Sequence, residues 1–414
     1  VQLRDGARAI GKIADVALMA STLASALLRA GRTQPKLSHA SALRTVYTQV
    51  GTTTARTATL ATTAKNGMRK PRVGVAGATG AVGIEMRKKL EERGFPMESL
   101  KLFAHPSEEG TPITFAGKEY KCESVKDGCF DDLDICLFSA GGDFSKEFAP
   151  KAAAAGCVVV DNSSVFRMDP KCPLVVPEVN PHAVQGHNNI IANPNCTTIL
   201  MNVPVYPLHK AFHVERAVVS TYQAASGAGL DAMKELEQQA RDWAAGDPLT
   251  QDIFGRQYIW NLFCHNSPMY EDNGYNQEEW KMVEETPKIF EGPFRVGVTC
   301  VRVPVLRAHC ESINLQFGRR VTLKEVYDVL GKAPGVRVVD DRVNNQHPEP
   351  QKVSGLDEIL VGRVRHDVSA FCADGGPPLT EAGGYGIDLF ISGDQLLKGA
   401  ALNAVQIAEL LLNK

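Results

Sequence analysis

The stretch that most constrains the fold is a glycine-rich turn, VGVAGATGAVG, at residues 73–83. The apolar run Arg72–Ala76 before it predicts a buried strand, and residues 84–93 after it predict an amphipathic helix. Glycines at this spacing, between a strand and a helix, let the backbone approach a pyrophosphate at the helix N-terminus. We therefore predict a Rossmann-type dinucleotide-binding domain that opens near Pro71, although many glycine turns bind nothing.

A second constraint is the stretch IIANPNCTTIL at residues 190–200. The apolar residues 190–192 predict the end of a buried strand, Asn-Pro-Asn breaks it, and a helix follows until Pro204. Cys196 then lies near a helix N-terminus, where the dipole and free N–H groups favour a thiolate and can stabilise an oxyanion. Two interpretations remain open here: Cys196 is a covalent nucleophile, or it is a buried small hydrophobe like most free cysteines.

The rest of the chain divides into two patterns. Up to residue 160 the strand-and-helix pattern of the dinucleotide-binding domain continues, with predicted strands at 100–104, 133–139 and 157–160 and a predicted helix at 145–155. After Cys196 the pattern becomes that of an α+β domain on an antiparallel or mixed sheet. Its predicted strands are 217–223, 294–303 and 312–317, its predicted helices are 230–245 and 395–412, and residues 246–276 predict a long surface excursion.

The first 70 residues differ from the rest in composition. They hold eleven Lys or Arg, two acids (Asp5 and Asp15) and no Glu, and they are rich in Ala, Ser and Thr. This composition is typical of an organelle transit peptide, and a disordered leader without function is the alternative. A plastid is the expected destination, with a mitochondrion as the alternative.

Bulk properties exclude several classes of protein. The 414 residues suffice for two domains, and a net charge of -2 implies no nucleic-acid partner. No stretch reaches the roughly twenty apolar residues that span a bilayer, so no membrane partner is expected. The ten cysteines form no C-x-x-C pair and no cluster with His at zinc spacing, which predicts no metal site and a reducing compartment.

Several stretches, taken in order, closely resemble aspartate-semialdehyde dehydrogenase. The matching pieces are VGVAGATGAVG at 73–83, SAGGD at 139–143, DNSSVFRMD at 161–169, VPEVN at 176–180, NPNCTT at 193–198, STYQAASGAG at 220–229, EEWKMVEET at 278–286, RVPVLRAHCES at 302–312 and KGAALNAVQIAE at 398–409. The resemblance covers the chain from about residue 71 to its end.

The resemblance implies a fold and a reaction. We expect an α/β protein with an NADP-binding domain of residues 71–196 and 392–414, and an α+β catalytic and dimerisation domain of residues 197–391 with a mixed sheet. The implied reaction converts L-4-aspartyl phosphate to L-aspartate 4-semialdehyde with NADPH and releases phosphate. The step leads to lysine, threonine, methionine and isoleucine, and the implied assembly is a homodimer or homotetramer.

The resemblance also implies roles for the catalytic residues. Cys196 is carried over as the nucleophile, which forms a thioester that hydride reduces. His309 is carried over as the acid–base residue, a task that suits imidazole near pH 7. Gln223 orients the cysteine and its intermediate, and Asn195 supports the oxyanion.

Charged residues are implied to hold the substrate. Arg302 matches the arginine that grips the α-carboxylate, and Glu278 matches the acid that meets the ammonium, although Glu279 adjoins it. Lys281 and Arg167 match the phosphate-binding pair. Without the resemblance, the acids and lysine at 278–281 would be interpreted as a solvated helix face.

A larger set of residues is implied to contact the cofactor. These are Gly77, Thr79, Gly80, Ala81, Val82, Gly83, Ser107, Ser139, Ala140, Gly141, Ser163, Ser226, Gly227 and Lys398. One segment departs from the family: where members often carry R-S-x-G to meet the 2′-phosphate, this chain has HPSEEG at residues 105–110. No acid stands directly after the predicted strand 100–104, which favours NADP, and Ser107 can still meet the 2′-phosphate. Glu108 and Glu109 follow closely, so a strict preference for NADP over NAD stays open.

Three rival functions are weighed against this one. N-acetyl-glutamyl-phosphate reductase would carry a glycine before the cysteine and Tyr-Pro after it, whereas this chain has Asn195 and Thr-Thr. Phosphorylating glyceraldehyde-phosphate dehydrogenase shares Cys-Thr-Thr but lacks the segment from Arg302 to His309. A non-catalytic, redox-sensing dinucleotide-binding module would need no acid–base or carboxylate-binding partners for Cys196.

Overall fold

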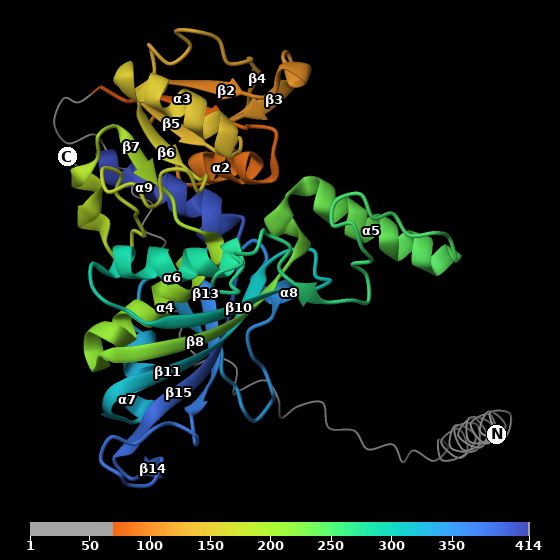
Figure 1. Ribbon diagram of the computed structural model, residues 1–414. Helices are drawn as coiled ribbons and strands as arrows, with labels where there is room; N and C mark the ends of the chain where they lie inside the picture. Colours follow the sequence, from red (N-terminus) through yellow and green to blue (C-terminus); the bar gives the residue numbers. More distant parts are fainter. Residues whose placement is uncertain (1–68, 413–414) are drawn as a thin grey trace, which may run out of the picture. The chain divides into compact units, whose positions relative to one another are not determined.

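The structure is a computed structural model that describes residues 69–412 (Figure 1). The predicted leader at residues 1–70 lies outside the described residues, apart from Arg69 and Lys70. The described part begins with a five-stranded parallel sheet in the order β2-β1-β5-β6-β7. Its strands are β1 (Arg72–Ala76), β2 (Ser99–Phe103), β5 (Ile135–Phe138), β6 (Val158–Asp161) and β7 (Ile190–Ala192), and a hairpin of β3 (Pro112–Phe115) and β4 (Lys118–Lys121) follows β2.

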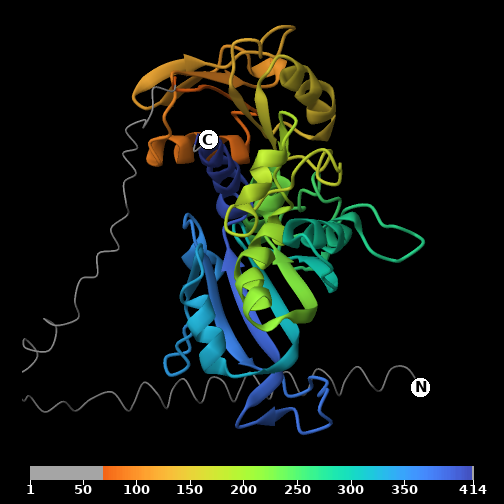
Figure 2. The ribbon, with the colours of Figure 1, turned by 90° about the vertical axis from the view of Figure 1, so that its left-hand side faces the viewer.

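Helices cover both faces of the parallel sheet. α2 (Ala81–Glu92) and α9 (Leu402–Leu412) pack against one face, and α3 (Gly142–Ala154) packs against the other. Figure 2 shows the C-terminal helix, in dark blue, returning to lie beside α2, in orange. Because both faces are buried, the strands are apolar at nearly every position. The predicted Rossmann-type fold is confirmed.

The glycine-rich turn lies where the strand order reverses, because β1 has β2 on one side and β5 on the other. Gly77 follows β1 with φ +80°, and a Cβ built on it would lie 2.2 Å from Ser139 O in the loop after β5. A Cβ on Gly83 would lie 2.0 Å from Gly77 O. Only glycine fits these two close approaches, and open α/β sheets bind their ligands at such a switch point.

The second part of the fold is an eight-stranded mixed sheet in the order β12-β13-β15-β11-β8-β10-β9, with β14 paired to β15. Its strands are β8 (Val214–Gln223), β9 (Phe263–Cys264), β10 (Val296–Arg302), β11 (His309–Val321), β12 (Val336–Val338), β13 (Ile359–His366), β14 (Leu379–Thr380) and β15 (Gly383–Gly393). β8 runs parallel to β10 and antiparallel to β11. The predicted mixed sheet is therefore confirmed.

One face of the mixed sheet carries a layer of helices (Figure 1). The helices of this part of the chain are α4 (Cys196–Phe212), α5 (Leu230–Ala245), α6 (Gln277–Phe290), α7 (Leu323–Leu330) and α8 (Pro350–Val353). α4, α6 and α7 bury their apolar residues against the sheet in one continuous core. The carboxyl ends of β8 and β10 and the N-terminus of α4 meet at the cavity described below.

Two expectations about local structure are wrong. α4 does not stop at Pro204 but continues through Pro204 and Pro207 to Phe212. Its residues 197–205 are buried, and this packing outweighs the hydrogen bond that each proline removes. The segment 246–276 is not wholly a surface excursion, because Phe254 and Tyr258 are buried in an apolar cluster with α5.

The predicted C-terminal helix has an irregular start. Residues Leu397–Ala401 form a π-helical turn before α9 begins, and such turns are frequent at functional sites. The turn brings Gly399 against the catalytic stretch, since a Cβ built on it would lie 3.0 Å from Cys196 Cβ. None of the helices that the structure describes is both long and apolar enough to span a membrane.

Candidate active site

A cavity of about 360 Å³ lies between the parallel sheet and the mixed sheet. Its lining comes from the glycine turn, the loops after β5 and β6, the start of α4, the end of β8, α6, and the π-helical turn. The lining residues are Val82, Ser139, Asn162, Arg167, Pro194, Asn195, Cys196, Gln223, Ser226, Gly227, His265, Glu278, Lys281, Arg302, Gln395, Leu396, Gly399 and Ala400. The structure thus brings together three of the four predicted catalytic residues and all four predicted substrate residues.

The turn before α4 places Cys196 at the first helical position. Asn195 is the N-cap, and its Oδ1 accepts hydrogen bonds from Thr197 N at 3.1 Å and Thr198 N at 3.4 Å. Its Nδ2 donates to Glu278 Oε1 at 3.0 Å. Asn195 therefore fixes the start of α4 and links it to α6. The second N–H bond of its Nδ2 remains for the oxyanion role expected from the sequence.

The charge state of Cys196 differs from the sequence expectation. Burial, and next the charge of Glu278, raise the pKa of Cys196 to about 12, although Arg302, Lys281 and Arg167 act in the opposite direction. The helix N-terminus therefore does not produce a resting thiolate, because desolvation outweighs it. Burial and Glu278 thus favour the thiol form of Cys196 at neutral pH.

Replacing Glu278 with glutamine is expected to lower the pKa of Cys196, because the nearby carboxylate disfavours the thiolate. The pH profile of iodoacetamide alkylation, read by peptide mapping at Cys196, measures this pKa directly. We expect the midpoint to move to lower pH in Glu278→Gln and to stay in place in Glu284→Gln, a neighbouring acid on α6. An unchanged or higher midpoint in Glu278→Gln would contradict the electrostatic account.

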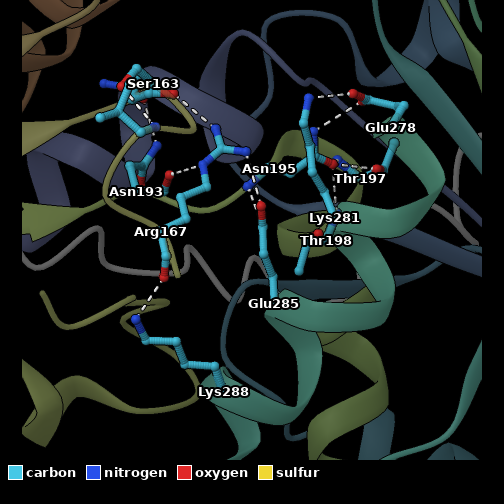
Figure 3. A network of polar contacts seen from close by, with 12 residues as sticks. Ser163, Arg167, Asn193, Asn195, Thr197, Thr198, Glu278, Lys281, Glu285 and Lys288 are labelled. Atoms are coloured by element: carbon cyan, nitrogen blue, oxygen red, sulfur yellow. Dashed lines mark hydrogen bonds and ion pairs between the residues drawn. The ribbon is translucent and has the colours of Figure 1, made fainter. Parts of the chain in front are cut away.

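Glu278 is buried and lies at the right-hand end of the polar network in Figure 3, beside Lys281. Its carboxylate accepts from Asn195, from Gln223 Nε2 at 3.1 Å and from Lys281 Nζ at 2.9 Å. Burial alone would raise its pKa, but Lys281, His265 and the hydrogen bond from Asn195 hold the pKa well below its usual range. Glu278 is thus an anion in the cavity wall, which agrees with the ammonium-binding role expected from the sequence.

The adjacent acid has a structural role. Glu279 forms a capping box with Asn276, and its Oε1 also accepts from Cys300 N at 3.0 Å. The alternative that Glu279 faces the substrate is therefore excluded by its contacts. Both acids are buried, so the interpretation of this segment as a solvated helix face is wrong.

Arg302 and His309 lie behind the loop that follows β8. Arg302 donates from Nη1 to Ala224 O at 3.1 Å, and its buried Nε has no partner among the described residues. His309 Nδ1 accepts from Ala224 N at 3.0 Å, so the neutral ring carries its proton on Nε2. A Cβ built on Gly227 would lie 3.0 Å from both Arg302 Nη1 and His309 Nε2, which shows that both groups lie directly against this cavity-lining glycine.

Burial, and next the charge of Arg302, lower the pKa of His309 to about 3. The imidazole is therefore neutral at physiological pH. Its buried Nε2 has no partner in the described part of the chain, but His309 is the predicted catalytic residue that does not itself line the cavity; it lies against Gly227, which does. Such an unpaired buried donor is expected where a substrate oxygen completes the hydrogen bond.

Arg167 is held firmly before any ligand binds (Figure 3). Its Nε donates to Asn193 O at 3.0 Å, its Nη2 donates to Asn162 O at 2.8 Å, and its Nη1 pairs with Glu285 Oε1 at 3.0 Å. These bonds use three of the five guanidinium N–H groups. The other two remain for the phosphate contact expected from the sequence.

Glu285 is a positioning residue that the sequence analysis did not select. It is 1% exposed, and its second oxygen accepts from Asn195 N at 2.7 Å. One carboxylate thus connects the Arg167 guanidinium to the backbone of the turn that carries Cys196. The available signal was its place seven residues after Glu278, two helical turns further along the same side of α6.

Neutralising Glu285 is expected to impair the site, because Glu285→Gln leaves Arg167 without its buried counter-charge and weakens the bond to Asn195 N. We expect kcat/KM to fall by about 10- to 100-fold and KM for phosphate to rise in the reverse reaction. Glu285→Asp, which keeps the charge, should recover part of the loss. A loss of kcat/KM that is the same for every substrate, with KM for phosphate unchanged, would show that Glu285 acts only in folding.

Twelve of the predicted cofactor residues lie in four places. Gly77, Thr79, Gly80, Ala81, Val82 and Gly83 form the turn and the start of α2, and Ser139, Ala140 and Gly141 form the facing loop after β5. Ser226 and Gly227 line the cavity from the catalytic side. Ser163, after β6, donates from Oγ to Asp161 Oδ2 at 2.6 Å. The glycine cradle between β1 and β5 fits a pyrophosphate.

Two other predicted cofactor residues make contacts within the protein. The Lys398 ammonium is buried and donates to Glu178, to Asn403 at 2.8 Å and to Gln406 at 2.7 Å, so all its protons are used away from the cavity. Ser107 is exposed and bonds with His105 Nδ1 at 2.8 Å. The residue of this loop that reaches the glycine turn is Glu108.

Two further cavity residues were missed. His265 lines the cavity, and burial, followed by the charge of Arg302, lowers its pKa to about 4 against the opposing effect of Glu278. Gln395 bonds with Ser226 and accepts from Ala308 N at 2.9 Å, which supports the backbone beside His309. Neither residue stands in a motif from which its role could be derived. Residues 69–412 contain no group of three or more His, Cys, Asp or Glu that could hold a metal ion.

Comparison with known families matches both parts of this chain. Residues 72–187 match the family model described as semialdehyde dehydrogenase, NAD binding domain. Residues 205–398 match the model described as semialdehyde dehydrogenase, dimerisation domain. The two models together cover most of the described chain, and the second indicates an oligomer.

Individual relatives agree. Aspartate-semialdehyde dehydrogenase of Synechocystis sp. is 48% identical over 83% of this chain and 98% of its own length. The crystal structure of aspartate semialdehyde dehydrogenase II from Vibrio cholerae, complexed with ASA, is 40% identical with a TM-score of 0.78 over 84% of this chain and 99% of that one. The Candida albicans enzyme with NADP, 22% identical with a TM-score of 0.62 over 83% and 98% of the chains, shares the fold. The resemblance found in the sequence is confirmed, and the chain belongs to the aspartate-semialdehyde dehydrogenase family.

Proposed function

We propose that this protein reduces L-4-aspartyl phosphate to L-aspartate 4-semialdehyde, with NADPH as the hydride donor and phosphate as the second product. The observation that carries this proposal is the set of charges around Cys196. Arg302, Glu278 and the pair Arg167 and Lys281 line one cavity with the nucleophile. These groups complement a carboxylate, an ammonium and a phosphate, which are the three charged groups of the substrate.

Substrate binding prepares the nucleophile. The free N–H bonds of Arg302 meet the α-carboxylate, and the Glu278 carboxylate meets the ammonium. Because the charge of Glu278 contributes to the raised pKa of Cys196, an ammonium beside Glu278 lowers that pKa. The site therefore favours the thiolate only when the correct substrate is present.

The chemical steps take place on Cys196. Sulfur attacks the acyl carbon, the C–O bond to phosphate breaks, and Arg167 and Lys281 stabilise the leaving phosphate. The remaining N–H of Asn195 and the Nε2–H of His309 are donors for the developing oxyanion. Bound nicotinamide supplies the hydride that reduces the thioester. The thiohemiacetal then collapses to the aldehyde and the Cys196 thiol, as His309 passes the hydroxyl proton from oxygen to the departing sulfur.

The glycine turn and the loop after β5 would hold the cofactor. The close approaches at Gly77 and Gly83 leave bare backbone at the N-terminus of α2, where a pyrophosphate is favoured. Ser226 and Gly227 line the same cavity beside the nucleophile, so they bound the space that the nicotinamide would enter.

The reaction is tested in the reverse direction, as phosphate-dependent reduction of NADP with L-aspartate 4-semialdehyde. Turnover with this substrate supports the proposal. N-acetyl-glutamate semialdehyde is run in parallel, and turnover with that substrate alone would place the enzyme in arginine synthesis instead. If folded protein binds the cofactor but turns over neither substrate, the proposed reaction is wrong and only the assignment of the fold remains.

We also propose that the protein acts as a homodimer, with a homotetramer as the alternative. One face of the mixed sheet is covered by helices, whereas the other carries partly exposed side chains such as Tyr222, which is 38% exposed. Tyr222 and Phe390 pair on this open face with ring centroids 6.1 Å apart. A second copy of the chain would bury this face.

For residues 1–70 we propose targeting to an organelle, with a plastid preferred to a mitochondrion. The support is the basic, acid-poor composition of this segment. In that location the enzyme would supply the synthesis of lysine, threonine, methionine and isoleucine.

A further inference from the structure

The loop after β2 places an acid against the glycine-rich turn. The backbone N–H groups of Gly77 and Ala78 both donate to Phe103 O at 2.9 Å, so the end of β2 is joined to the turn after β1. Glu108 then returns to the same turn, where its Oε2 accepts a hydrogen bond from Thr79 Oγ1 at 2.8 Å. The half-buried Glu108 carboxylate therefore forms part of the wall of the dinucleotide site.

The two glutamates of this loop have different partners. Glu109 accepts from Ser124 Oγ at 2.8 Å and pairs with Lys126 Nζ at 2.9 Å, so its charge is compensated away from the turn. The Glu108 carboxylate makes no ion pair with any residue in the described part of the chain. Residues 104–110, AHPSEEG, contain neither lysine nor arginine. One uncompensated negative charge thus faces the glycine turn.

A basic side chain also reaches the turn. Arg87 of α2 donates from Nε to Ala78 O at 3.2 Å, and burial lowers the pKa of its guanidinium. The turn is thus bounded by an acceptor, Glu108, and a cation, Arg87. A ribose hydroxyl can donate a hydrogen bond to Glu108, whereas a ribose phosphate can form an ion pair with Arg87.

The end of the second strand is where this fold selects its cofactor. An acid there accepts a hydrogen bond from the ribose 2′-hydroxyl of NAD, whereas an arginine nearby accommodates the 2′-phosphate of NADP. We propose that Glu108 is a specificity-determining residue that makes this enzyme accept NADH as well as NADPH. Repulsion between the carboxylate and a 2′-phosphate removes the preference for NADPH that Arg87 would otherwise give.

Binding of two nucleotide fragments tests this proposal without turnover. Adenosine 2′,5′-bisphosphate and 5′-AMP differ only in the 2′-phosphate, and calorimetric titration gives their Kd ratio. For the wild type we expect Kd values within about threefold of each other, and in Glu108→Ser a shift of about tenfold or more toward the bisphosphate. Glu108→Gln, which can keep the bond to Thr79, should shift the ratio in the same direction.

Glu109→Ser is the matched control, and we expect it to leave the ratio unchanged because its charge is already paired with Lys126. A wild-type preference for the bisphosphate of about 100-fold or more, or an unchanged ratio in Glu108→Ser, would overturn the proposal. This inference rests on the proposed function only for the identity of the reaction, because the binding of the fragments is measured without turnover. Fragment ratios as expected, without turnover by either cofactor, would therefore contradict the proposed function and leave this inference standing.

Discussion

Replacing Cys196 with serine is expected to lower kcat by about 10³-fold or more while leaving the fold and cofactor binding intact. The reason is that every covalent step uses this sulfur, and a serine hydroxyl is a far weaker nucleophile at neutral pH. The substitution is nearly isosteric at a site whose helix start is fixed by Asn195. Steady-state kinetics, together with thermal unfolding and NADPH titration, separate lost chemistry from lost structure.

Cys264→Ser is the matched control for this prediction. Cys264 is exposed and lies next to His265, which lines the same cavity, but Cys264 itself is absent from the lining. We expect its kinetics to equal those of the wild type. Full activity in Cys196→Ser, or an equal loss in both variants, would exclude Cys196 as the nucleophile.

Replacing His309 with asparagine is expected to lower kcat by about 10²- to 10⁴-fold, the range typical of a lost acid–base residue. Asparagine can still accept the hydrogen bond from Ala224 N, so the loop that carries Gly227 should stay in place. Because the loss concerns proton movement, we expect it mainly in kcat. A KM effect alone would instead make His309 a substrate-binding residue.

The same histidine predicts a stability trend. Its pKa is about 3 in the folded protein, and it returns to about 6.5 in the unfolded chain. Between these values the unfolded state binds more protons, so the free energy of unfolding falls as the pH is lowered from about 6.5. His309→Asn should flatten this slope in chemical denaturation at pH 5 and pH 7, and a slope as steep as that of the wild type would show that His309 contributes nothing to it.

The parts of the fold that were predictable depend on local sequence. The glycine turn after β1 was predictable because Gly77 and Gly83 must allow backbone contacts that no side chain permits. The strand, turn and helix around Cys196 were predictable because Asn193 to Asn195 supply a break and a cap. The end of α4 was not predictable, since burial of residues 197–205 outweighs the effect of Pro204 on the helix.

The site was less predictable because its electrostatics depend on contacts between distant residues. Glu285 lies 118 positions from Arg167 in the sequence, yet the two form a buried ion pair. The resting state of Cys196 could not be derived from its helix position, because burial and Glu278 set its pKa. Lys398 stands in a matching motif but uses its charge to hold Glu178 and α9, which only the packed structure reveals.

Trapping of the acyl-enzyme shows directly whether Cys196 is the covalent nucleophile. Protein is incubated with L-aspartate 4-semialdehyde and NADP without phosphate, quenched in acid and mapped by peptide mass spectrometry. We expect an aspartyl thioester on the peptide that contains Cys196, lost when phosphate is added and absent from Cys196→Ser. Turnover by the same preparation without any acyl adduct on Cys196, or with the adduct on another residue, would contradict this expectation.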